Sequence, residues 1–191
     1  MHEVEAVKTE SQRIQIQSIL ASKDPIYADI WAFMLNTALR VSDALSISMA
    51  DLQQLDTERP SLRVREQKTG KHRNIMLNSG AIAIIRKRQE KHPDDVWLFQ
   101  TTSSKIRRSQ PQPINRRSVG RVLEAIGSQI TPRVKLGCHS ARKTRGYALH
   151  ASGHSIEKIS RILNHSSVSI TMRYIGITQA DIDDSFTELV L

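Results

Sequence analysis

Apolar residues recur at helical spacing along most of the chain, which predicts helices that each bury one face. Ile16, Ile19 and Leu20 form such a face within residues 1–23. Asp24-Pro25 is typical of a helix start, because an Asp cap precedes a proline at the first helical position. Further helices are predicted over residues 25–38, 42–46 with Ser42 as the cap, 79–91, 115–127, 139–152, 155–163, 167–174 and 180–191.

One segment alternates between apolar and basic residues instead. Residues 62–65 and 75–77 show this period of two, and Thr69-Gly70 supplies a turn between them. The pattern predicts a β-hairpin with a cationic tip. Residues 52–56 are expected to add a third strand. The predicted fold class is therefore mainly α with a small three-stranded antiparallel β-sheet.

Charge adds information about partners. The chain has 191 residues, enough for one domain with a short appendage, and its 28 Lys and Arg against 19 Asp and Glu give a net charge of +9. A basic surface favours a polyanionic partner, because neutralising phosphates releases counterions. Nucleic acid is the favoured partner; an anionic membrane, or no polyanion at all, are the alternatives.

Cysteine content and the N-terminus bear on location. Cys138 is the single cysteine, so an intramolecular disulfide and a cysteine zinc cluster are excluded. Residues 1–10 lack the basic start and apolar run of a signal peptide, and no apolar stretch has the length of a membrane span. We expect a cytoplasmic protein.

Three short motifs and two single residues stand in a recognisable order. His139-Ser-Ala-Arg142 is followed by Leu163-Asn-His165 and then by Tyr174, while Arg40-Val-Ser-Asp43 closes a predicted buried helix upstream, and Lys68 lies at the hairpin tip. This order and spacing resemble the tyrosine recombinase (phage integrase) family over about residues 25–178. The resemblance implies the catalytic-domain fold of that family and a DNA strand-exchange reaction.

The resemblance also implies a role for each residue. Cutting a phosphodiester without metal requires a nucleophile, positive charge on the phosphoryl oxygens and a proton donor. Tyr174 resembles the family's nucleophile, which forms a 3′-phosphotyrosine and needs no nucleotide cofactor. Arg40 and Arg142 match the arginines that grip the non-bridging oxygens, since guanidinium binds phosphate in a bidentate manner. His139 matches the acceptor of the tyrosine proton or a phosphate ligand, and His165 a hydrogen-bond donor to the scissile phosphate.

Two further positions complete the implied set. Lys68 matches the general acid for the departing 5′ oxygen, on a hairpin that we expect to be mobile, and Lys71 is its rival. Asp43, three residues after Arg40 and expected on the same helix face, resembles the acidic residue that orients this arginine; a surface ion pair is the alternative. Two positions depart from the family, since Lys143 stands where it usually has His and Asn164 where it usually has Gly.

Other basic residues are candidate DNA contacts, with ordinary solvated surface as the alternative for each. These candidates are Lys71, Arg73, Lys105, Arg107, Arg108, Arg116, Arg117 and Lys143. No metal site is expected among the histidines, because no third ligand is evident.

We expect three parts: an N-terminal helical lead-in over 1–23, the catalytic domain over 24–178 and a tail helix over 179–191. The tail stripe of Ile182, Phe186 and Leu189 docks either on its own domain or on a neighbouring subunit. Since few residues precede the catalytic pattern, the chain is either a fragment or similar to short members such as the fimbrial DNA invertases.

The resemblance further implies double-stranded DNA as the partner, a homo-tetramer on paired sites, a monomer or dimer without DNA, and accessory DNA-bending proteins. A bacterial or phage-encoded protein associated with the nucleoid, with no membrane partner, fits this picture. Two alternatives remain: a type IB topoisomerase-like nicking-closing enzyme, or a regulator that binds DNA through a helix-turn-helix over residues 155–170.

Overall fold

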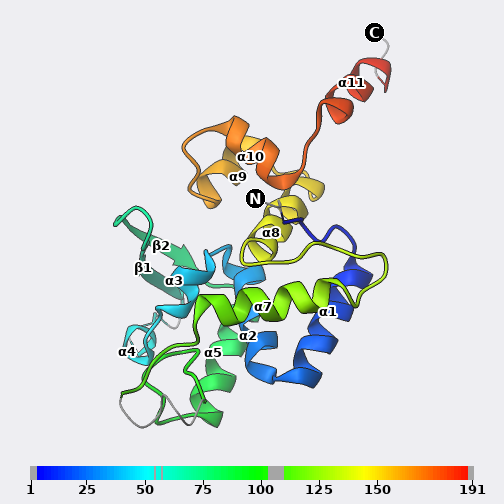
Figure 1. Cartoon of the computed structure of the whole chain (residues 1–191). Helices are drawn as coiled ribbons and strands as arrows, with labels where there is room; N and C mark the ends of the chain where they lie inside the picture. Colours follow the sequence, from blue (N-terminus) through cyan, green and yellow to red (C-terminus); the bar gives the residue numbers. More distant parts are fainter. Residues whose placement is uncertain (1–3, 54, 57, 103–109, 189–191) are drawn as a thin grey trace.

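The computed structural model describes residues 4–53, 55–56, 58–102 and 110–188, and it is mainly helical (Figure 1). The helices are α1 (Glu10–Lys23), α2 (Pro25–Thr37), α3 (Val41–Leu45), α4 (Met49–Leu52), α5 (Ser79–Lys91), α7 (Arg116–Gly127), α8 (Ser140–Ala151), α9 (Ile156–Ile162), α10 (Val168–Ile175) and α11 (Gln179–Glu188). The strands are β1 (Ser61–Arg65) and β2 (His72–Met76).

Both expected N-terminal helices are present, and α2 begins at Asp24-Pro25 as predicted. Thr9 caps α1 by accepting a hydrogen bond from the Gln12 backbone N–H, and Asp24 caps α2 through the Ile26 N–H. Pro25 takes the first helical position, where its missing N–H costs nothing. Asp24 ends α1 and caps α2, and it therefore fixes the turn that brings α1 back against α2.

The hairpin is confirmed, but the expected third strand is wrong. β1 and β2 pair antiparallel with Leu62 opposite Ile75, and the described sheet has two strands. The segment expected to extend it begins in α4, where Ser48 and Asp51 form a capping box that favours a helical turn. Asp56 then accepts hydrogen bonds from the Glu58 and Arg59 N–H groups and bends the chain.

A large apolar core surrounds α2. Trp31, Phe33 and Met34 are almost fully buried there, and Leu62 and Val64 of the hairpin join the same cluster. Burying each side chain of this size contributes about 1.5–3 kcal/mol. This core fixes the end of α2 and the base of the hairpin.

A second, smaller cluster joins α8, α9 and α10. Its buried members include Leu149, Ile159, Leu163 and Ile175. Gly146 lets α8 approach α10 closely, since a Cβ at this position would lie 2.7 Å from Cγ2 of Ile175. The end of α10 that carries Tyr174 therefore rests on this cluster.

The tail forms the predicted helix, α11, which extends away from the rest of the chain in Figure 1. Phe186 is 80% exposed. The Ile182 side chain and all of Leu189 lie outside what the structure describes, so docking of the stripe stays a prediction.

Candidate active site

Tyr174 lies between the two histidines of the motifs. Its hydroxyl is 3.4 Å from Nδ1 of His139, and its ring meets that of His165 edge-on with 4.8 Å between centroids. His139 immediately precedes α8, His165 lies in the turn between α9 and α10, and Tyr174 is in the last turn of α10. The packing of these three helices thus brings together residues that are separated in sequence.

The phenol is protonated at neutral pH. Burial raises the pKa of Tyr174, while the charges of Arg142 and Arg40 and a hydrogen bond with Arg142 act against this rise. A partly buried phenol of this kind becomes a nucleophile only when a base accepts its proton. The nitrogen of His139 is placed to serve as that base.

Both histidines are poised to be neutral. Desolvation and then the charges of nearby arginines, Arg116 first, lower the pKa of His139. Burial and the charges of Arg142, Arg40 and Lys68 lower the pKa of His165 to about 4. Nδ1 of His165 is 3.0 Å from the Thr171 hydroxyl, which is fully buried in α10. Thr171 was not predicted, although its place three residues before the tyrosine puts it on the same helix face.

Arg142 is the most deeply placed cation of the site. It is only 1% exposed, and its guanidinium donates to the carbonyl of Ala38 at 2.5 Å and to the carbonyl of Leu163. Burial lowers its pKa to about 10, so it stays charged at neutral pH. Since Ala38 ends α2 and Leu163 ends α9, this one side chain joins the helices on which the two halves of the site rest.

Arg40 pairs with two acidic groups, and the expected partner Asp43 is not the nearer one. Arg40 is the residue before α3 and has an extended backbone, so it does not share a helix face with Asp43, and Ser42 lies inside the helix rather than at its cap. Asp43 is 3.9 Å from Arg40, whereas Glu66 is closer, at 3.1 Å. The buried Asp43 carboxylate instead accepts the backbone N–H of Gln67 at 3.0 Å.

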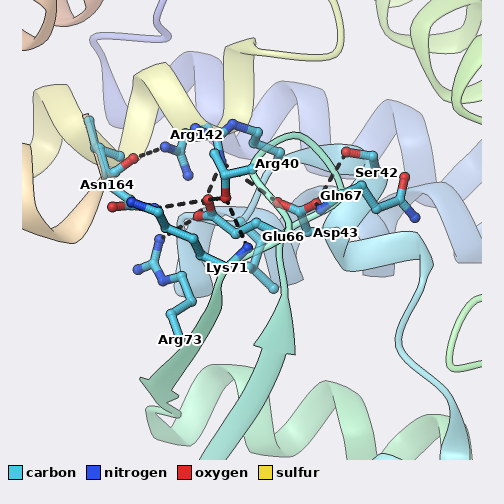
Figure 2. Close-up of polar contacts among 12 residues, drawn as sticks. Arg40, Ser42, Asp43, Glu66, Gln67, Lys71, Arg73, Arg142 and Asn164 are labelled. Carbon is cyan, nitrogen blue, oxygen red and sulfur yellow. Dashed lines mark hydrogen bonds and ion pairs between the residues drawn. The ribbon is translucent and has the colours of Figure 1, made fainter. Parts of the chain in front are cut away.

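Glu66 is a second site residue that the motifs missed. It is 1% exposed and lies between Arg40, Arg73 and Asn164 (Figure 2). Burial alone would raise its pKa, but hydrogen bonds from Asn164 and Thr69 and the charge of Arg40 lower it to about 2. The strand alternation could have revealed it, because Leu62, Val64 and Glu66 share one face of the hairpin.

Lys68 lies in the turn between β1 and β2 and is exposed. Its charge contributes to the lowered pKa of His165, which places the turn within electrostatic reach of the site. The rival Lys71 is also exposed, and its backbone carbonyl accepts the Glu66 N–H at 2.9 Å. The role of Lys68 as general acid stays a prediction.

The candidate DNA contacts divide into three groups. Arg116 and Arg117 are exposed in the first turn of α7. Arg73 instead bonds Glu66 and the Ile162 carbonyl, and Lys143 is 7% exposed with its ammonium 5.3 Å from the centre of the Tyr174 ring. The remaining basic-loop candidates lie outside the described residues: Lys105, Arg107 and Arg108.

Within the described ranges, no three His, Cys, Asp or Glu side chains form a group that could hold a metal ion. No helix described there has the length and apolar character required to cross a membrane.

Comparison with known proteins decides the family. Residues 4–180 match the model of the phage integrase family. A Bacillus subtilis (strain 168) relative, "Probable integrase/recombinase YoeC", is 31% identical over 94% of this chain and 93% of its own length. The chain belongs to the phage integrase family. It is a tyrosine-type site-specific recombinase.

Other relatives of this recombinase are longer. Tyrosine recombinase XerC of Pelobacter propionicus is 27% identical, with 76% of this chain matching 45% of that protein. The crystal structure of XerA recombinase superposes with a TM-score of 0.71 at 18% identity, covering 98% of this chain and 65% of the other. A structure of the Tn1549 transposon integrase superposes with a TM-score of 0.73 at 16% identity, covering 99% of this chain and 67% of the other. The predicted catalytic-domain fold is therefore confirmed. The chain spans about half the length of several of the relatives that it matches.

Proposed function

We propose that this recombinase cuts and rejoins double-stranded DNA through a covalent 3′-phosphotyrosine at Tyr174. The observation that carries the proposal is the position of the Tyr174 hydroxyl, 3.4 Å from Nδ1 of His139 and beside His165 and Arg142. Nucleophile, base and charge-stabilising groups thus lie around one point. The Tn1549 integrase neighbour was solved in complex with transposon right end DNA, which supports a duplex as the substrate.

In the first step His139 accepts the phenolic proton as the Tyr174 oxygen attacks the phosphorus. Arg40 and Arg142 hold the non-bridging oxygens as negative charge develops on them. Nδ1 of His165 is 3.0 Å from the Thr171 hydroxyl, which leaves Nε2 as the ring nitrogen that can bond the phosphate.

In the second step the bond from phosphorus to the 5′ oxygen breaks, and Lys68 gives that oxygen its proton. The phosphotyrosine keeps the energy of the broken ester, so attack by a 5′ hydroxyl from a second duplex reverses the chemistry without a nucleotide cofactor. Pairing of two sites by four subunits would place that hydroxyl. The guanidiniums supply the positive charge, and cleavage should therefore persist in EDTA.

Covalent capture tests the proposal. Genomic DNA of the source organism is fragmented, lightly nicked and incubated with the protein, and attached DNA is recovered under denaturing conditions and sequenced. We expect enrichment of one sequence by the wild type and none by Tyr174→Phe. Tyr27→Phe and Tyr147→Phe, which alter the other two tyrosines, should trap normally.

The recovered sequence then supplies a synthetic suicide duplex. DNA binding without any trapped adduct would overturn the proposal and favour the helix-turn-helix regulator. Relaxation of supercoiled DNA without exchange between two sites would favour the topoisomerase-like alternative.

A further inference from the structure

A buried carboxylate lies at the junction of the two arginine-bearing segments and the hairpin. Glu66 is 1% exposed, and its oxygens contact four side chains. Oε1 is 3.1 Å from Arg40 Nη1 and 3.4 Å from Arg73 Nη1. Oε2 accepts from Thr69 Oγ1 and Asn164 Nδ2, both at 2.9 Å. Figure 2 shows this convergence.

Three of the four partners of Glu66 are a residue of the proposed reaction or lie next to one. Arg40 is itself a phosphate ligand in that reaction, Thr69 follows Lys68, and Asn164 precedes His165. The backbone of Glu66 also closes the turn that carries Lys68, since its N–H bonds the Lys71 carbonyl and its carbonyl accepts the Gly70 N–H at 2.8 Å. One residue thus contacts three separate parts of the site.

The Asn164 contact is specific because its backbone is constrained. Asn164 has φ of 47°, in the left-handed region that favours glycine and tolerates asparagine. A glycine at this position could adopt the same backbone but could not reach Glu66. Arg73 adds a parallel link, since it bonds both Glu66 and the Ile162 carbonyl at 2.8 Å. The hairpin is therefore tied to the end of α9 by two side chains.

Burial makes these contacts obligatory. A carboxylate removed from water is stabilised only when charged or hydrogen-bonding partners surround it. Glu66 meets this need with two guanidiniums, one hydroxyl and one amide, and each partner is thereby fixed relative to the others. Ordering several reacting groups before substrate arrives is what a preorganised active site requires.

We propose that Glu66 is a positioning residue that holds Arg40, the Lys68 turn and the His165 turn in one fixed arrangement. It touches no DNA in this role and acts through Arg40 first. The proposal rests on the function proposed above and adds to it the group that sets the relative positions of three reacting residues.

The experiment uses the suicide duplex recovered with the wild-type protein. Glu66→Gln should lower the single-turnover cleavage rate at saturating protein by about 100-fold, the scale of a misplacement of about 1 Å. Its Kd for the duplex should stay within about threefold, since a buried group makes no phosphate contact. Asp29→Asn is the matched control, because Asp29 is another buried carboxylate, paired with Lys87 at 2.6 Å. It should cleave at the wild-type rate.

A double-mutant cycle separates positioning from a general loss of structure. If Glu66 acts through Arg40, then adding Glu66→Gln to an Arg40→Lys variant should lower the cleavage rate of that variant by less than about tenfold. Glu66→Asp keeps the charge and should cleave at least about tenfold faster than Glu66→Gln. If Glu66→Gln does not fold, Glu66→Asp takes its place in the cycle with a smaller expected loss.

Distinct results would overturn the two proposals. Failure of the wild type to form any adduct would remove the proposed function. A wild type that traps DNA while Glu66→Gln cleaves equally fast would overturn the role of Glu66 alone. Independent losses in the cycle, or an Asp variant no faster than the Gln variant, would also overturn it.

Discussion

The two apolar clusters divide the site between them. Arg40 and the base of the hairpin rest on the large core around α2, whereas His165 and Tyr174 rest on the small cluster of α8, α9 and α10. The half proposed to bind the phosphate and protonate the leaving 5′ oxygen is thus built on an extensive core. The half that carries Tyr174, the proposed nucleophile, is built on a few side chains, among them Ile159 and Ile175.

The difference shows where the site depends on polar contacts. Glu66 spans the halves through Arg40 and Asn164, and Arg142 joins the end of α2 to the end of α9 through the carbonyls of Ala38 and Leu163. A region with few buried apolar contacts opens at lower free energy than the main core. The reacting groups are therefore aligned only while these buried polar links hold the small cluster against the large one.

Lys68 should give the largest effect, and it tests the role of the large-core half. Lys68→Ala should slow cleavage of the suicide duplex by about 10²–10⁴-fold, the usual contribution of a general acid. When sulfur replaces the scissile 5′ oxygen of the duplex, Lys68→Ala should slow cleavage by less than about tenfold, because a thiolate leaves without a proton. Single-turnover rates on both duplexes provide the measurement.

Lys71→Ala is the comparison, since Lys71 is the rival on the same hairpin. As a DNA contact it should weaken binding, and saturating protein should restore its cleavage rate. If sulfur instead rescues Lys71→Ala and leaves Lys68→Ala slow, the acid is Lys71.

Paired truncations test the difference in stability. Ile85→Ala, in the large core on α5, should lower the free energy of unfolding by about 2–5 kcal/mol, as usual for a fully buried isoleucine. Ile175→Ala, in the small cluster, should lower it by less, because part of the loss is confined to local opening. Chemical denaturation gives the global values, and hydrogen exchange should show faster exchange in α9 and α10 for Ile175→Ala alone.

Equal global losses for these two variants, with exchange raised throughout the chain in both, would contradict the division into two clusters. In the divided molecule, Ile175→Ala should also reduce trapped adduct at a temperature where the chain remains folded. Ile85→Ala should trap normally under the same condition.

Periodicity predicted most of the helices and the hairpin because their apolar faces are regular. The family resemblance implied that Tyr174, His139 and His165 share one site, and the structure brings them together. The prediction of a third strand over residues 52–56 is wrong because the capping box of Ser48 and Asp51 commits the start of that segment to helix. Local capping overrode a short apolar pattern that fits strand and helix alike.

The buried polar links were harder to predict from sequence. Arg142 stands in the basic run 142–145, where nothing local distinguishes a buried guanidinium from a solvated one. Its partners are backbone carbonyls of α2 and α9, which only the tertiary fold identifies. Glu66 was accessible through strand parity, but its partners Arg40 and Asn164 come from distant segments.

The pH dependence of stability gives the smallest expected effect and concerns the small cluster. Burial and nearby cations hold the pKa of His165 at about 4, below its ordinary value of 6.5. Between these values the unfolded chain binds a proton that the folded chain does not, so lowering the pH through this window destabilises the fold. Because the ring is only partly buried, we expect a destabilisation of about 1 kcal/mol, which is absent above pH 6.5.

His165→Gln should therefore show a shallower loss of unfolding free energy from pH 6.5 to 4 than the wild type, measured by urea denaturation at each pH. His150→Gln, on the exposed last turn of α8, is the control and should follow the wild type. Identical pH profiles for His165→Gln and wild type would mean that protonation of this ring is not linked to the docking of α9 and α10.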